Sequence, residues 1–78
     1  MENQRLIDEF HKTSVEKVKI HLQGWKGNAY IDVRVWKVEG SQDQQADIAT
    51  KKGICISIEL LPDLIKILQK AWDFHQGN

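Results

Sequence analysis

Apolar and polar residues alternate along two segments in the first half of the chain. Within Val15–Gln23, apolar side chains recur at every second position, and mostly cationic side chains stand between them. This two-residue period predicts a strand with one buried face. Ala29–Val38 repeats the period, and Gly24–Asn28 between the two segments supplies turn residues, so a hairpin is predicted. One face of the second strand carries isoleucine and valine, and the other carries Tyr30, Asp32, Arg34 and Trp36.

The segment after this hairpin begins with a polar loop. Gly40–Ala46 is rich in Gln and has no apolar period, so we expect an exposed loop. Asp47–Thr50 is a short candidate strand, and Thr50–Gly53 predicts a tight basic connection. The last strand is marked by isoleucines at alternate positions, and its other face carries Cys55 and Ser57. Cys55 is expected to be a small, buried or half-buried strand residue.

A helical pattern occupies the C-terminal part of the chain. Ser57 is typical of a helix N-cap, and helical spacing continues from there to His75. Pro62 stands late for a first-turn proline, so either the opening turn is distorted or the regular helix begins near Pro62. The apolar arc of this helix is too wide for a helix that lies on one small sheet with its back to water. A twofold homodimer is therefore predicted. Its expected interface consists of Leu61, Leu64, Ile65, Leu68 and Trp72.

Length and composition restrict the class of protein. The 78 residues suffice for one domain, with 41% hydrophobic and 28% charged residues and no apolar run of membrane-spanning length. The N-terminus lacks the pattern of a secretory signal, so a cytoplasmic protein is expected, associated with the nucleoid if the source is prokaryotic. The formal net charge is zero, but residues 11–38 carry six cations and two anions, whereas residues 39–50 carry three anions and no cation. Such a polarised surface can steer an anionic polymer to one side.

Rings and cations share one face of the predicted hairpin, a combination that suits unstacked bases and phosphates. Each aromatic residue alone has a structural alternative, because Trp36 could pack under the polar loop and Tyr30 could cover a sheet edge. Lys19 belongs to a strand face that is expected to be solvated and is only a candidate contact. The histidines lack metal-site spacing, and no paired carboxylates, phosphate loop or nucleophile motif indicates an enzyme or a cofactor. Asp32 is expected to hold Arg34 by a hydrogen-bonded pair.

These segments together resemble a known family. The run Trp25-Lys26-Gly27, the strand Tyr30–Trp36, and Lys51-Lys52-Gly53-Ile54 followed by a strand and helix are similar to the transcriptional positive cofactor 4 family, whose members are single-stranded DNA-binding coactivators. Leu60–Leu64 resembles the shorter prokaryotic members. The resemblance implies an α+β fold, in which a curved antiparallel four-stranded sheet is followed by one C-terminal helix and the helices form the homodimer.

The resemblance also assigns roles to residues of this chain. It implies that Trp25 stacks on a base, that Trp36 stacks or lines the groove, and that cations neutralise phosphates with little sequence preference. The implied nucleic-acid contacts are Trp25, Lys26, Arg34, Trp36, Lys51 and Lys52, with Lys19 and Tyr30 as further candidates. Gln23 and Asn28 stand where many members have cations, so fewer phosphate contacts and a weaker salt dependence are expected.

The expected organisation is an N-terminal extension over residues 1–14, whose order the sequence leaves open, a binding domain over residues 15–75 and a tail over residues 76–78. The predicted function is non-enzymatic, sequence-tolerant binding of single-stranded DNA, in transcription or in the protection of unpaired DNA. Two alternatives stay open. One is a dimeric adaptor that recruits the transcription machinery, which the zero net charge favours. The other is a binder of single-stranded RNA, because stacking and phosphate contacts do not distinguish the sugars.

Overall fold

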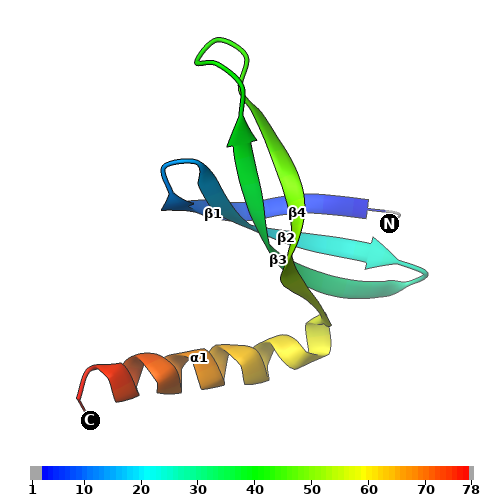
Figure 1. The fold of residues 1–78 in the computed structure, drawn as a ribbon. Coiled ribbons are helices and arrows are strands. Elements are labelled where there is room, and N and C mark those ends of the chain that lie inside the picture. Colours follow the sequence, from blue (N-terminus) through cyan, green and yellow to red (C-terminus); the bar gives the residue numbers. More distant parts are fainter. Residues whose placement is uncertain (1–2, 78) are drawn as a thin grey trace.

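A computed structural model describes residues 3–77 and contains one antiparallel sheet followed by one long helix (Figure 1). The sheet has the order β1-β2-β3-β4, so each strand pairs with its neighbour in the sequence. A single 3₁₀ turn, η1, joins the sheet to the helix. The elements are β1 (Asn3–Thr13), β2 (Glu16–Trp25), β3 (Asn28–Glu39), β4 (Ala46–Ser57), η1 (Ile58–Leu60) and α1 (Leu61–His75). The predicted α+β fold, a four-stranded antiparallel sheet with one C-terminal helix, is confirmed.

Strands β2 and β3 match the two segments predicted as a hairpin, but the other two strands differ from the segments that the sequence pattern indicated. The first strand, β1, lies within the N-terminal extension, and its pairing with β2 runs from Asn3 opposite Gly24 to Thr13 opposite Glu16. Its register shifts twice, once between Leu6 and Asp8 and again before Thr13. Each shift interrupts the two-residue alternation on which the prediction relied. Met1 and Glu2 of the extension, and Asn78 of the tail, lie outside the described residues.

The predicted basic connection at Thr50–Gly53 is wrong, because these residues belong to one continuous strand, β4. In β4, Gly53 lies opposite Arg34 and Ala49 lies opposite Trp36, so three residues of β4 stand against Val35 alone. This bulge replaces the expected turn and merges the short candidate strand with the last strand. A bulge and a turn share the same signals in sequence, namely polar residues and a glycine.

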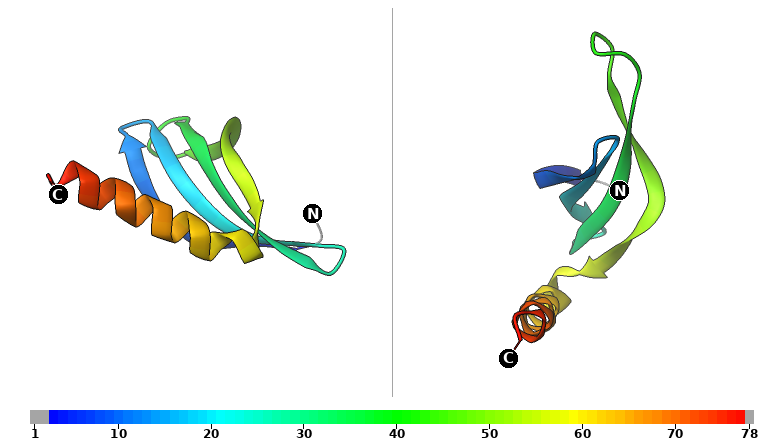
Figure 2. Two further views of the ribbon diagram at one scale, coloured as in Figure 1. Left: turned by 90° about the horizontal axis from the view of Figure 1, so that it is seen from below. Right: turned by 60° about the vertical axis from the view of Figure 1, so that its left-hand side comes forward.

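The apolar faces of the sheet and helix meet around an open hollow of about 390 Å³. Figure 2 shows α1 running along one face of the curved sheet. The hollow is lined by Ile7, Phe10, Val18, Ile20, Ile31, Val33, Leu61, Leu64, Ile65 and Leu68. Of the described hydrophobic residues, only Ile31 is buried, at 6% exposure, whereas Leu68 is 59% exposed. A single chain therefore leaves its core open.

The start of the helix follows the predicted signals. The Ser57 hydroxyl accepts a hydrogen bond from the Glu59 amide at 3.4 Å, so Ser57 caps η1 rather than α1. The regular helix begins one turn later, with Pro62 in its first turn, where the missing amide hydrogen costs no hydrogen bond. Cys55 lies in a strand as predicted, but its expected burial is wrong, because it is exposed in the edge strand β4. No helix in residues 3–77 is long and apolar enough to cross a membrane.

Candidate nucleic-acid interface

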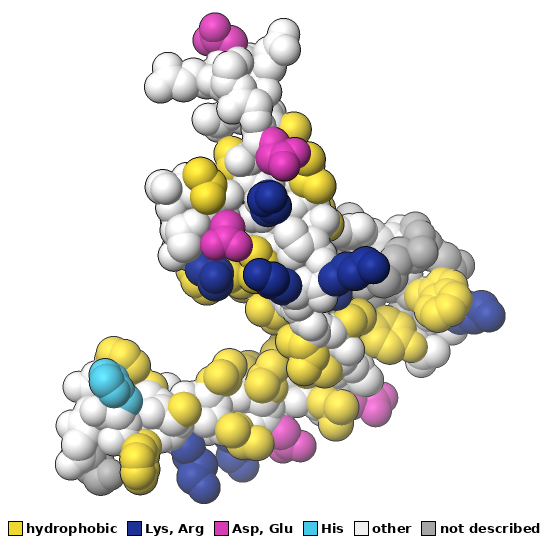
Figure 3. All heavy atoms as spheres, viewed as in Figure 1, with side chains coloured by type: hydrophobic (Ala, Val, Ile, Leu, Met, Phe, Trp, Pro, Cys, Tyr) yellow, Lys and Arg dark blue, Asp and Glu magenta, His cyan; other side chains and the backbone are white. Residues whose placement is uncertain are grey.

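The polar face of the sheet is formed by cross-strand pairs between β2 and β3. Lys17 lies opposite Trp36, Lys19 opposite Arg34, and Gln23 opposite Tyr30. Because alternate strand residues share a face, the predicted set of Tyr30, Arg34 and Trp36 lies on the side away from the apolar hollow. In the space-filling view, basic side chains gather over the middle of the sheet, with acidic ones beside them (Figure 3).

Arg34 is held in place by two neighbours. Its Nε and Nη2 donate to the two carboxylate oxygens of Asp32 at 3.1 and 2.9 Å, and its Nη1 donates to the Thr50 carbonyl at 3.1 Å. The hydrogen bonds to Asp32 raise the pKa of Arg34 above its usual value. The structure thus contains the Asp32–Arg34 pair expected from the sequence. It also shows that the guanidinium secures the bulge of β4, which the sequence did not indicate.

The bulge in β4 presents two lysines. The Thr50 hydroxyl donates to the Val35 carbonyl at 2.7 Å and accepts from the Lys52 amide at 3.2 Å. It therefore ties the two ends of the bulge together and joins the bulge to β3. The bulge ends at Gly53, where only glycine fits, because a Cβ at this position would lie 2.5 Å from the Val33 carbonyl oxygen. Lys51 and Lys52 are exposed, and neither pairs with a carboxylate within the described part of the chain.

The lysines of β2 are neutralised by two carboxylates, contrary to the prediction of a cationic strand face. Asp47 Oδ2 accepts from Lys17 Nζ at 3.1 Å and from Lys19 Nζ at 2.7 Å. Glu9 adds contacts of 3.3 and 3.5 Å to the same two lysines. Hydrogen bonds to Asp47 and then Glu9 raise the pKa of Lys17, and hydrogen bonds from Lys19 and Lys17 lower the pKa of Asp47. We call these four residues the acid–lysine cluster.

The Trp36 ring is packed against its neighbours on this face and is not open for stacking on a base. Lys19 Nζ lies 4.7 Å from the centre of the Trp36 ring, and the His21 ring lies 5.5 Å away at an angle of 33°. Trp36 Nε1 and His21 Nδ1 are buried without a hydrogen-bond partner among the residues described. Of the two roles that the resemblance allows Trp36, lining the groove fits this packing better than stacking on a base.

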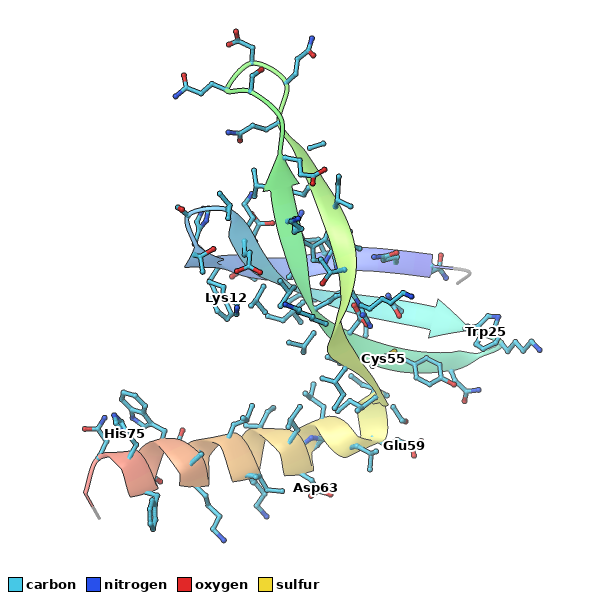
Figure 4. All side chains as sticks on the ribbon, in the orientation of Figure 1. Lys12, Trp25, Cys55, Glu59, Asp63 and His75 are labelled. Atoms are coloured by element: carbon cyan, nitrogen blue, oxygen red, sulfur yellow. The ribbon has the colours of Figure 1, made fainter. Side chains whose placement is uncertain are left out.

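Trp25 and Lys26 occupy the tip of the β2–β3 hairpin. Trp25 pairs with Asn28, and the two loop residues between them have positive φ, 51° at Lys26 and 79° at Gly27. Positive φ at both positions defines a type I′ turn, whose twist matches that of the flanking strands. Trp25 is 49% exposed, with Lys26 Nζ 5.1 Å from the ring centre. In Figure 4, Trp25 projects from the end of the hairpin, at the opposite side of the molecule from His75.

The candidate residues therefore form two groups along the sheet. Arg34, Trp36 and Lys19 are adjacent at the middle of the sheet, with Lys51 and Lys52 beside them in the bulge. Trp25 and Lys26 stand at the hairpin tip, six residues along β2 from Lys19, which corresponds to about 20 Å. Tyr30 lies between the two groups, opposite Gln23 and Ser57. Each group thus offers an exposed cation and an indole ring.

Sequence reasoning did not identify Glu9 and Asp47 as part of this face. Glu9 belongs to the strand that the pattern missed, and Asp47 reaches across β3 to contact β2. The one available signal was that Asp47 alternates with apolar residues in a candidate strand. In the part of the chain that the structure describes, no group of three or more His, Cys, Asp or Glu side chains could hold a metal ion.

Lowered pKa values make stability depend on pH, and Asp47 is the residue to test. Its carboxylate stabilises the fold above the pKa of the unfolded chain, and this contribution is lost as the pH falls through the lower, folded pKa. Asp47→Asn removes that contribution. As the pH is lowered below about 4, the free energy of unfolding of the variant should therefore fall less steeply than that of the wild type. Urea unfolding between pH 5 and pH 2 measures this difference. Asp43→Asn, in the exposed loop, should follow the wild type; parallel curves for all three proteins would exclude the role given to Asp47.

Comparison with known proteins identifies the family. The sequence profile described as Transcriptional Coactivator p15 (PC4) matches residues 12–67, which is more than half of the chain. The chain belongs to the PC4 family. This family consists of non-enzymatic, DNA-binding transcription coactivators. A search of curated protein sequences found no match.

Solved structures of PC4 homologues share the fold. The PC4 homologue from Burkholderia pseudomallei is 28% identical, with a TM-score of 0.76, and the match covers 88% of this chain and 97% of that one. A second crystal form of the same homologue gives 27% identity and a TM-score of 0.75, with coverage of 91% and 92%. The bacteriophage T5 homologue of PC4, implicated in recombination-dependent DNA replication, matches with a TM-score of 0.58 over 95% and 86% of the chains. Its identity of 19% makes this a likeness of fold alone.

Proposed function

We propose that this PC4-family protein is a homodimeric, sequence-tolerant single-stranded DNA-binding protein that acts as a transcription coactivator or protects unpaired DNA. Its proposed location is the cytoplasm, at the nucleoid in a prokaryote, and its action is non-enzymatic. The observation that carries the proposal is the exposed Trp25 ring at the hairpin tip of a sheet whose strand β4 carries two exposed lysines in its bulge. Stacking on such a ring suits any base, because every base has a flat face.

The arrangement supports a single strand better than a duplex. A chain of unpaired nucleotides is flexible and can lay one base on Trp25 while its phosphates approach Lys51 and Lys52, about 20 Å along the sheet. A duplex keeps its bases stacked on one another, so it would gain only the phosphate contacts. Family membership supports DNA as the polymer.

The open core supports the homodimer. The hollow between sheet and helix is entirely apolar in its lining, and the helix residues that face it include the predicted interface residues Leu61, Leu64, Ile65 and Leu68. Trp72, the fifth predicted residue, is exposed one turn further along. Apolar surface of this extent is normally covered in a stable protein, and a second copy offers a surface of matching chemistry.

A titration with unstructured DNA tests the proposed function. Oligothymidylate should quench tryptophan fluorescence, and the affinity should weaken with salt. If Lys26, Lys51 and Lys52 each contact one phosphate, the slope of log affinity against log salt should be about −2. A parallel titration with oligouridylate tests DNA against RNA. The proposal predicts that the affinity for oligothymidylate is no lower than the affinity for oligouridylate. No quenching and no binding at low salt would contradict the proposal.

One observation favours a second function, that of a protein-interaction adaptor for the transcription machinery. The acid–lysine cluster cancels two cations on the polar face, and the net charge of the chain is zero. A surface with so little net charge attracts a polyanionic ligand less strongly. The same titration separates the two functions, because an adaptor would show an unchanged signal.

A further inference from the structure

The acid–lysine cluster is not needed for the binding just proposed, and it reduces the charge available for it. We propose that Asp47, assisted by Glu9, is a specificity-determining residue that makes the sheet face select polyanions with stackable bases over polyanions that offer charge alone. It would do so by occupying Lys17 and Lys19. The inference rests on the proposed function, in that it concerns the same sheet face.

The geometry gives Asp47 the position that a ligand phosphate would otherwise take. One oxygen, Oδ2, accepts hydrogen bonds from both lysines, at 3.1 and 2.7 Å, although Asp47 lies on β4 and the lysines lie on β2. The carboxylate therefore spans the intervening strand, β3. The contacts are partly covered, because the Asp47 and Lys19 side chains are 21% and 13% exposed. A phosphate that approaches the two lysines must therefore displace an acid that is already in place.

Competition of this kind affects ligands unequally. A duplex or an inorganic polyphosphate binds through phosphates alone, so the loss of two cations to internal carboxylates removes a large part of its attraction. A single strand keeps the stacking on Trp25, which the cluster does not touch. Asp47 also holds Lys19 beside Trp36, whose ring lies 4.7 Å from Lys19 Nζ. The cluster therefore lowers charge-only binding most.

Asp47→Asn tests the proposal against three probes: oligothymidylate, a blunt duplex of the same length, and inorganic polyphosphate. The affinity for duplex and polyphosphate should rise on the order of 10-fold at low salt, with a salt slope steeper by about 0.9 on the duplex. The affinity for oligothymidylate should rise by a smaller factor. Asp43→Asn, in the exposed β3–β4 loop, makes the same change in charge and should leave the ratio of affinities as in the wild type.

Two further variants locate the effect. Glu9→Gln should shift the ratio in the same direction, and Asp47→Asn in a Lys17→Met, Lys19→Met background should have no effect, because the lysines that it releases are absent. Circular dichroism melts identify any variant that fails to fold, in which case Glu9→Gln carries the test. An unchanged ratio in Asp47→Asn, or a ratio that changes equally in Asp43→Asn, would overturn the inference. If the wild-type protein fails to bind oligothymidylate, the proposed function fails and the selectivity assigned to Asp47 fails with it; if the wild type binds and only the ratio is unchanged in Asp47→Asn, the inference alone fails.

Discussion

Leu68→Glu is expected to convert the proposed dimer into monomers or unfolded chains. Leu68 lines the apolar hollow from the helix side and is 59% exposed in one chain, and in the proposed dimer the second copy would bury it. A twofold dimer contains the residue twice. A loss of about 2 kcal/mol at each copy would raise the dissociation constant roughly 1,000-fold. Sedimentation equilibrium of the wild type and the variant measures this change, with circular dichroism as the readout of folding.

Gln69→Glu is the matched control, because it also adds one negative charge and lies on the next residue of α1. Gln69 is exposed, and its side-chain amide donates to Asp73 Oδ1 at 2.9 Å on the polar side of the helix. We expect this variant to stay dimeric, with at most a small loss of stability from the new carboxylate beside Asp73. A dimeric, fully folded Leu68→Glu protein would show that the helix face is not the interface, and the open hollow would then need another occupant.

Trp25→Ala should weaken binding of oligothymidylate on the order of 10- to 100-fold, because base stacking on one aromatic ring contributes about 1 to 3 kcal/mol. Trp25 is exposed at the hairpin tip and does not line the apolar hollow, so the fold should be largely unaffected. The type I′ turn depends on the positive φ of Lys26 and Gly27 rather than on the indole. Fluorescence anisotropy of a labelled oligonucleotide measures the affinity, and a thermal melt checks the fold.

Trp25→Phe serves as the control for this variant. It retains a flat ring at the same place and should keep most of the affinity, whereas a purely structural role for the indole would make both variants lose stability together. Equal affinities for wild type and Trp25→Ala would remove the observation on which the proposed function rests. Because neither variant alters a lysine, the salt slope should be nearly the same in all three proteins.

The prediction succeeded where a segment has an uninterrupted period. Strands β2 and β3 follow alternating positions without a register shift, and their hairpin was placed correctly on the turn residues. It failed where the alternation is broken. The shift between Leu6 and Asp8 concealed β1, and the bulge opposite Val35 made β4 look like two strands and a turn. A bulge moves side chains to the opposite face, so a search for strict alternation loses the strand.

The candidate site shows the same division. The sequence was sufficient to place Trp25, Lys26 and the Asp32–Arg34 pair, because these features depend on a turn or on neighbours two residues apart in one strand. It could not show that Thr50 closes a bulge, or that Lys19 covers Trp36. Those contacts join different strands, and they exist only once the register between strands is set.

By itself, then, the sequence determined the fold class, the polar and apolar faces of the central hairpin, the helix and the family resemblance, since each follows from local periodicity or short motifs. The tertiary structure alone decided which cations remain available. It brought Asp47 across β3 to Lys17 and Lys19 and left Lys51 and Lys52 without such partners among residues 3–77. The physical reason is that attraction between charges depends on distance in space, and residues 28 to 30 positions apart become neighbours only through the curvature and pairing of the sheet.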